Sequence, residues 1–224
     1  MRYYIYFITY LQHTLVGGSV LYLMTAPIFM SFYPDLLPSG YQATLFSISL
    51  SAVTFVMAIR PLADLFKSWR WLRSLVILRK GFGVVSASII VSFILSKIMM
   101  GGLVPYVTVM STGAYWSLDG YALLAHLGDI TAIILLLTSN NLSKRLLGKG
   151  WKRVQKLAYV YFYAGALYEV LAFSSSYALA CAVGVTTLVL VAFIKNRFIS
   201  KARAASAPAP MPTRGNDTVP SKRV

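Results

Sequence analysis

The sequence predicts an all-α membrane protein, a polytopic bundle of six transmembrane helices with both termini in the cytoplasm (N-in and C-in). The first observation is composition: 58% of the 224 residues are hydrophobic and 12% are charged, whereas soluble domains carry about 25% charged residues. The second is the place of the basic residues, which stand between apolar runs, as in the cytoplasmic loops of membrane proteins. The net charge of +15 therefore indicates membrane topology and not a nucleic-acid partner.

Six apolar segments reach the length that a helix needs to cross a bilayer. The hydrocarbon core is about 30 Å thick and each helical residue adds about 1.5 Å, so about 20 residues suffice. The second segment stops at Arg60-Pro61, and the third is rich in Gly and Ser, which let helices approach each other closely. A count of five stays open if one segment lies at the interface. The segments cover roughly 10–32, 42–59, 81–100, 118–138, 155–174 and 176–195.

The positive charges predict the orientation. Of the 21 Lys and Arg residues, all except Lys97 stand near the N-terminus or after the second, fourth and sixth segments. Basic loops stay on the cytoplasmic side of a membrane, so both termini are expected there. The chain is thus expected to be a multi-pass protein of the bacterial inner membrane, with the lipid bilayer as its first partner.

Two regions are expected along the chain. Residues 1–200 form the six-helix transmembrane domain. Residues 201–224 are rich in Pro, Ala and Ser and carry several cations, which predicts a disordered basic cytoplasmic tail. The single cysteine, Cys181, excludes an intrachain disulfide and any cysteine-based metal site, and no metal site is predicted.

Ionisable residues inside transmembrane helices are costly and are therefore candidates for function. His126 and Asp129 stand three residues apart in the fourth segment and share a face of the helix. They could form a proton relay, an ion site or a contact to a bound redox group, or a hydrogen-bonded pair that holds helices together. Glu169 in the fifth segment could act with them, or could reach the interface or pair with a neighbouring helix. His13, near the start of the first segment, is interpreted as structural.

Motifs of soluble enzymes are missing from the sequence. It contains no Gly-rich phosphate loop, no nucleophile elbow and no HExxH motif. Its loops are too short for a catalytic domain, so any chemistry would take place inside the bundle or through a partner. Catalytic residues therefore stay unknown at this point.

Two stretches resemble a known family. They are Arg60-Pro61-Leu62 followed by RSLVILRKGFG (73–83), and LLLTSNNLSKRLLGKGWKRVQKLAYVYFYAGALYEVLAF (135–173). This layout is similar to the ferric reductase-like transmembrane superfamily, in particular the haem-binding membrane subunits of bacterial methionine sulfoxide reductase systems. The resemblance covers about residues 40–175, and its most specific part is the loop that leads into the fifth segment.

The resemblance implies a helical bundle that holds b-type haem between histidines on the third and fifth helices. The corresponding positions in this chain are Phe93, Gln155 and Tyr168. Phenylalanine cannot bind iron, glutamine is a poor ligand, and tyrosine binds only as a phenolate, which an apolar site disfavours. The family scaffold is therefore expected without its usual bis-histidine haem, and whether any cofactor binds stays open.

Three functions follow from these observations. The first is a ferric reductase-like membrane protein, in or derived from a transmembrane electron-transfer role; if the chain is an enzyme, it is an oxidoreductase subunit. The second is a non-catalytic scaffold or accessory subunit of a larger complex, with a protein partner in the membrane or periplasm. The third is a small proton- or ion-handling transporter that uses Asp129 and His126.

Overall fold

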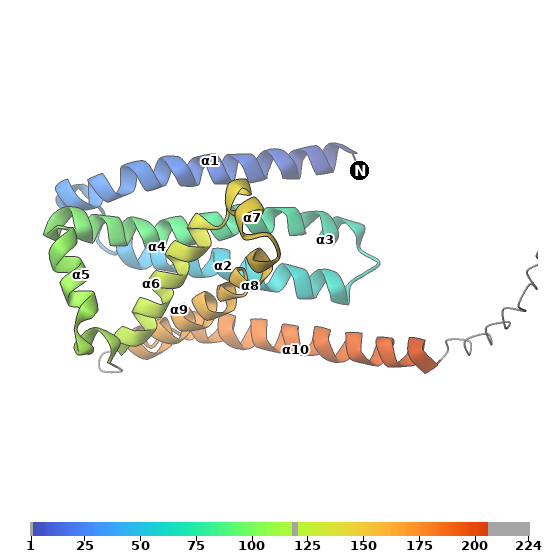
Figure 1. The fold of residues 1–224 in the computed structure, drawn as a ribbon. Helices are drawn as coiled ribbons and strands as arrows, with labels where there is room; N and C mark the ends of the chain where they lie inside the picture. Colours follow the sequence, from blue (N-terminus) through green and yellow to red (C-terminus); the bar gives the residue numbers. More distant parts are fainter. Residues whose placement is uncertain (1, 118–120, 206–224) are drawn as a thin grey trace, which may run out of the picture.

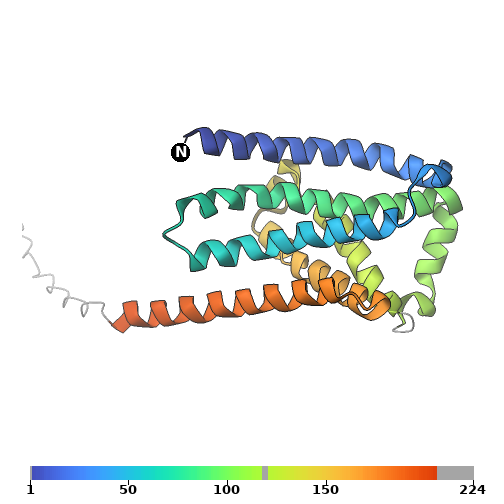
Figure 2. The same cartoon turned by 180° about the vertical axis from the view of Figure 1, so that it is seen from behind.

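The computed structural model describes residues 2–117 and 121–205, and over these residues the chain is helical and has no strand. Four long helices form the frame. They lie side by side in one row in the order α1, α4, α2, α10 (Figures 1 and 2). Their bounds are Arg2–Phe32 for α1, Tyr41–Leu65 for α2, Arg79–Gly101 for α4 and Ser176–Ala205 for α10.

Two shorter helices, α6 (Ala122–Leu137) and α9 (Leu157–Phe173), pack against one face of this row. α6 contacts α4 and α9, and α9 also contacts α2 and α10. The main core lies between these helices, where the side chains of Ala132, Phe162 and Ala166 are completely buried. Alanine at such contacts lets two helices approach closely, which is how helices gain packing energy in lipid.

Short helical pieces connect the long ones. They include α3 (Arg70–Leu75), α5 (Leu103–Ser111), α7 (Asn141–Leu147) and α8 (Trp151–Val154), none of which was predicted as a separate element. Among the described residues, 3-10 turns at Pro34–Leu36, Val76–Leu78, Gly113–Trp116 and Gly148–Gly150 also take part in the connections. The start of α7 is fixed by Asn140, whose side-chain oxygen accepts a hydrogen bond of 2.6 Å from the Ser143 backbone N–H.

Four helical stretches of the described chain are long and apolar enough to cross a membrane, which indicates a multi-pass membrane protein. A fifth results if α6 and the pieces after it count as one span, although the two parts meet at an angle of 95°. α9 is equally apolar but has only 17 residues. The four stretches are Tyr3–Phe32, Tyr41–Leu65, Trp71–Gly101 and Ser176–Phe198.

The predicted segments fall on the observed helices, but the outer helices are longer. The first helix begins at Arg2 and not near residue 10, and α10 continues to Ala205 and not to residue 195. At about 1.5 Å per residue both helices exceed the hydrocarbon core. The start of the fourth segment, 118–120, lies outside the described residues. The first five residues of the predicted tail belong to α10, and the rest of the tail also lies outside the described residues.

The sequence suggested that the second helix stops at Arg60-Pro61, but the helix continues past Pro61. Pro61 lies inside α2, which continues for another turn to Leu65 and ends where the Phe66 backbone N–H donates to the Leu62 carbonyl. A proline removes one backbone donor. In membrane helices neighbouring groups satisfy the carbonyl that it leaves without a partner, so the helix can continue.

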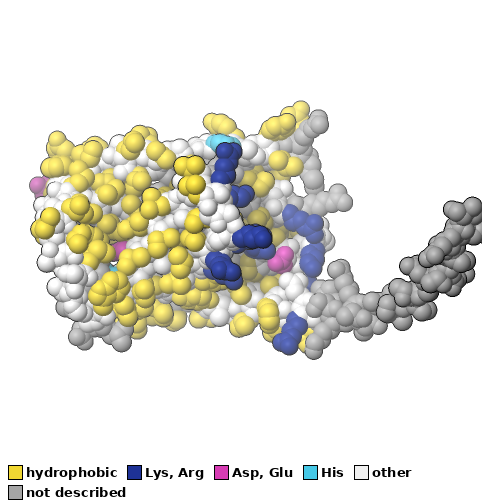
Figure 3. Space-filling view, in the orientation of Figure 1, with side chains coloured by type: hydrophobic (Ala, Val, Ile, Leu, Met, Phe, Trp, Pro, Cys, Tyr) yellow, Lys and Arg dark blue, Asp and Glu magenta, His cyan; other side chains and the backbone are white. Residues whose placement is uncertain are grey.

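The cations gather in one half of the molecule on the face shown in Figure 3. In the same orientation, Figure 1 places the N-terminus and the end of α10 toward this half. The two ends of the described chain therefore lie at the same end of the bundle. Which side of a membrane this end faces stays a prediction.

Gly81 provides a test of the contact between α1 and α4. A β-carbon at this position would lie 3.1 Å from Leu15 Cδ1 and 3.2 Å from Leu15 Cβ, whereas one at Gly17 would meet nothing within 4 Å. We expect Gly81→Val to force α1 away from α4 and to cost about 1–3 kcal/mol of stability. Gly17→Val should leave stability nearly unchanged. Thermal unfolding of the solubilised protein measures both, and equal melting temperatures for the two variants would contradict the packing.

Candidate functional site

Ionisable residues from three helices meet at one cavity, which we name the central cavity. It has a volume of about 130 Å³ and is lined by Lys97 of α4, Asp129 of α6 and Glu169 of α9. Gly128 and Gly165 also line it, and because neither carries a side chain, the space between the helices stays open. The remaining lining is mostly apolar, including Phe46, Leu50, Ile90, Ile94 and Phe162.

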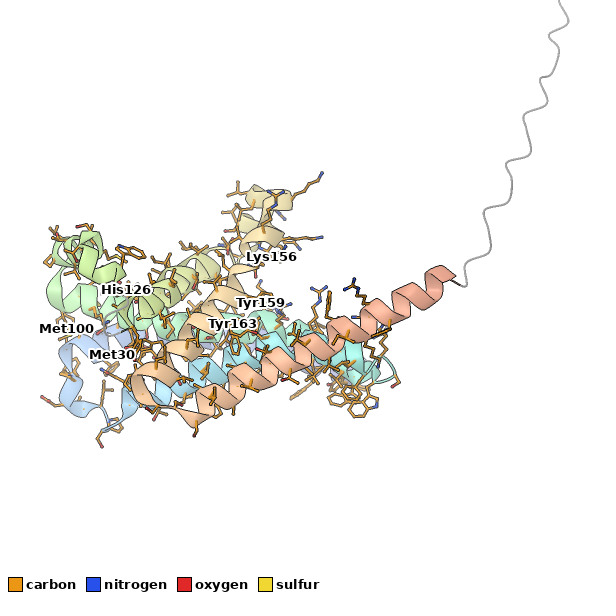
Figure 4. All side chains as sticks on the ribbon, turned by 90° about the horizontal axis from the view of Figure 1, so that it is seen from below. Met30, Met100, His126, Lys156, Tyr159 and Tyr163 are labelled. Carbon is orange, nitrogen blue, oxygen red and sulfur yellow. The ribbon has the colours of Figure 1, made fainter. Side chains whose placement is uncertain are left out.

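His126 lies beside the central cavity, one turn before Asp129 on α6. Its Nδ1 is 3.9 Å from Asp129 Oδ2, which is an ion-pair distance and too long for a direct hydrogen bond. Figure 4 shows His126 near the end of the bundle that carries Met30 and Met100, and away from Lys156. The structure therefore brings His126 and Asp129 together on one face, as their spacing predicted, and adds Glu169 from the neighbouring helix.

Lys97 is the member of this site that the sequence analysis missed. It was interpreted only as the single cation on the outer side of the membrane. In the structure it lines the central cavity and is close enough to both His126 and Asp129 to interact with them electrostatically. Its position in the apolar run IVSFILSKIMM was the available signal, because a charge inside a membrane helix is rarely placed there without a partner.

Three hydroxyl groups form a closed cluster at one end of the central cavity. Ser49 Oγ lies 2.9 Å from Ser86 Oγ and 3.0 Å from the Tyr161 hydroxyl, and Ser86 Oγ lies 2.8 Å from the same hydroxyl. All three side chains are buried. We name Ser49, Ser86 and Tyr161 the hydroxyl cluster; it joins α2, α4 and α9 through groups that both donate and accept.

A second, larger cavity adjoins the central cavity. Tyr161 and Val53 line both, and the second cavity has a volume of about 890 Å³. We name the second cavity the basic cleft, because six cations line it. Its lining includes Lys156 and Tyr159, which Figure 4 shows away from His126. Tyr161 is also close enough to Asp129 and Glu169 to interact electrostatically with both. The two cavities therefore meet at Tyr161 of α9, whose hydroxyl belongs to the hydroxyl cluster.

The positions that the family resemblance assigns to haem ligands divide between the two cavities. Phe93 and Tyr168 line the central cavity, and Gln155 lines the basic cleft. The ring of Phe93 stacks on that of Phe46, with 4.8 Å between their centroids. Cofactor pockets usually have about 300–1,000 Å³, and no histidine is among the described residues that line either cavity. The residues present around the central cavity therefore do not fit a haem.

Neither His13 nor a metal centre adds to the site. His13 is exposed on α1, where its Nδ1 lies 2.7 Å from the Thr9 carbonyl oxygen, one turn earlier. This local contact agrees with a structural role. Within residues 2–117 and 121–205, no three side chains of His, Cys, Asp or Glu come close enough together to hold a metal ion.

Comparison with models of protein families, with curated proteins and with solved structures finds no match to this chain. The resemblance to the ferric reductase-like superfamily therefore stays a prediction, and we infer function from the geometry of the site.

The central cavity combines a net negative lining with room for a few water molecules. When all three groups are charged, one ammonium faces two carboxylates, so the lining attracts a proton or a small cation. Carboxylates can also take up and release protons, and the hydroxyl cluster can pass a proton by reorienting its O–H bonds. The site can therefore bind a small positive charge inside an apolar bundle.

Proposed function

We propose that this chain is a multi-pass membrane protein that handles protons or small cations through the central cavity. The observation that carries the proposal is the convergence of Lys97, Asp129 and Glu169 from three helices on one cavity in an apolar bundle. Placing such groups inside a membrane domain is costly, and they concentrate along ion and proton pathways. A purely structural contact between two helices would need only one hydrogen-bonded pair.

The route in this proposal continues through the hydroxyl cluster into the basic cleft. Tyr161 lines both cavities, and its hydroxyl is within hydrogen-bonding distance of Ser49 and Ser86. A proton that leaves Asp129 or Glu169 would pass this cluster before it reaches the cleft. The hydroxyl of Tyr161 is thus the group through which the proton would pass from one cavity to the other.

The proposal includes six spans with both termini on the cytoplasmic side of the bacterial inner membrane. α6 and α9 have 16 and 17 residues, or about 24–26 Å of helix. They pack against the long helices of the row and carry Asp129 and Glu169 into the bundle. Two short spans of this length would cross a locally thinned bilayer.

Asp129→Asn tests the proposed function. The amide keeps the shape of the side chain but carries neither the charge nor the titratable proton. We expect wild-type protein in liposomes loaded with a pH-sensitive dye to carry a proton flux driven by a membrane potential. The flux of Asp129→Asn should fall to that of protein-free liposomes, while circular dichroism and gel filtration show a folded protein.

The matched control is Asp35→Asn, the same chemical change at an exposed position in the turn Pro34–Leu36. Its flux should equal that of the wild type. The proposal fails if wild-type protein gives no more flux than empty liposomes under proton, sodium and potassium gradients, or if Asp129→Asn behaves like Asp35→Asn.

Tyr161→Phe tests the route between the cavities. It removes the hydroxyl but keeps the ring, and the two serines can still pair with each other at 2.9 Å. We expect a stability loss of about 1 kcal/mol and a flux at least about tenfold lower. Tyr163→Phe is the control: in the wild-type protein the Tyr163 hydroxyl lies 2.8 Å from Thr186 Oγ1, and neither residue lines the central cavity or the basic cleft. Equal flux in the two variants would exclude Tyr161 from the path.

Cysteine labelling tests the six-span topology. In a Cys181→Ser background, an impermeant maleimide should label Ser39→Cys and Ser174→Cys from outside the cell. Ser68→Cys and Lys149→Cys should react only after the membrane is permeabilised. The label at position 149 distinguishes six spans from four, because Lys149 lies outside the cell if α6 and α9 do not cross the membrane. Labelling of Lys149→Cys in intact cells would therefore overturn six spans.

Electron transfer is the second candidate, and one observation favours a relation to that family. Phe93 and Tyr168, which stand where the resemblance implies haem ligands, line the same cavity from α4 and α9. This supports a scaffold derived from a ferric reductase-like bundle. A Soret absorbance in solubilised protein would favour retained electron transfer. The accessory-subunit alternative stays a prediction that co-purification of a partner would support.

A further inference from the structure

The basic cleft carries a second inference, independent of the central cavity. It lies among α2, α4, α9 and α10 and the short helices between α6 and α9. Six basic side chains line it, whereas Asp64 is the single carboxylate among its described lining residues. The six are Arg60, Arg79, Lys80, Lys144, Lys152 and Lys156.

These cations outnumber the single described carboxylate that lines the cleft with them. Within the part of the chain that the structure describes, none of the six forms an ion pair with a carboxylate. Arg60 and Arg79 line the same cleft and are close enough to repel electrostatically, and Arg79 is half-buried. A half-buried guanidinium beside a second one is unfavourable unless an anion lies between them. Guanidinium groups bind phosphate oxygens through two parallel hydrogen bonds, so phosphate is the anion that fits best.

Part of the cleft lining is apolar. It includes Val53, Met57 and Val84, which are buried, and Val189 and Phe193 of α10. A free phosphate or a small soluble anion would leave this surface without a matching partner. A molecule that joins a phosphate to a hydrocarbon chain would cover both parts.

Trp151 also lines the cleft and indicates the level of a bilayer at which the cleft would lie. Its indole N–H donates a hydrogen bond of 3.0 Å to the Thr138 carbonyl, and Lys144 Nζ lies 5.5 Å from its ring centroid. Tryptophans collect at the boundary between hydrocarbon and headgroups. Basic pockets between membrane helices at this level on the cytoplasmic side are suited to anionic headgroups.

We propose that the basic cleft is a binding site for an anionic phospholipid. Arg60, Arg79 and Lys80 hold its phosphate, and the apolar lining from α2 and α10 receives an acyl chain. The volume of about 890 Å³ lies in the range of pockets that bind whole small molecules. A lipid with two phosphates matches the number of cations better than one with a single phosphate.

The test is a titration of purified full-length protein with cardiolipin and with phosphatidylcholine, followed by native mass spectrometry. Wild-type protein should bind cardiolipin in preference to phosphatidylcholine. The double variant Arg60→Gln/Arg79→Gln should bind cardiolipin roughly 30-fold more weakly, because each cation near the headgroup contributes about fivefold. Lys67→Gln/Arg73→Gln is the matched control, because it removes the same charge from positions that do not line the cleft.

A competition with inorganic pyrophosphate tests for a soluble ligand, because pyrophosphate has two phosphates but no acyl chains. Pyrophosphate should not displace bound cardiolipin. The proposal is overturned if both double variants lose cardiolipin equally, if cardiolipin binds no better than phosphatidylcholine, or if pyrophosphate displaces the lipid. The last outcome would assign the cleft to a soluble phosphate compound. None of these outcomes depends on proton flux through the central cavity.

Discussion

The structure depends on the cost of polar groups in hydrocarbon. A backbone that crosses a membrane must satisfy its own hydrogen bonds, and the described part of the chain does so by being helical almost throughout. The same cost determines where charged side chains lie in the bundle. Lys97, Asp129 and Glu169 point to one shared cavity, and most other cations lie at one end of the bundle. The two cavities therefore divide the charged side chains between them: the central cavity is lined by one from each of three helices, and the basic cleft is lined by six cations.

Hydrophobic length was enough to predict where helices lie but not where they end. The predicted segments fall on α1, α2, α4, α6, α9 and α10, and four of these helices are long and apolar enough to cross a membrane. The ends differ because a helix does not stop where the hydrocarbon stops. No residue in the first turns of α1 breaks a helix, and Pro61 removes only one hydrogen bond from α2. Hydropathy contains no information on either point.

The site was predicted in part for a similar reason. His126, Asp129 and Glu169 were found because each is ionisable and lies inside an apolar run. Their meeting with Lys97 was not predictable, because it depends on how α4, α6 and α9 rotate about their axes. The hydroxyl cluster is a clearer case: Ser49 and Tyr161 are 112 positions apart, and both residue types are common in membrane helices. Only packing of the three helices shows that they bond.

The order of helices in the row has a consequence for biosynthesis. α1 packs chiefly on α4, while α2 follows it in the chain and lies on the far side of α4. When α1 leaves the insertion machinery, the helix that it will pack against has not been made. Many of the large apolar side chains of α1 are exposed on the finished molecule, because α1 lies at the edge of the row. The contact between α1 and α4 therefore forms only after α2 and α4 have been made.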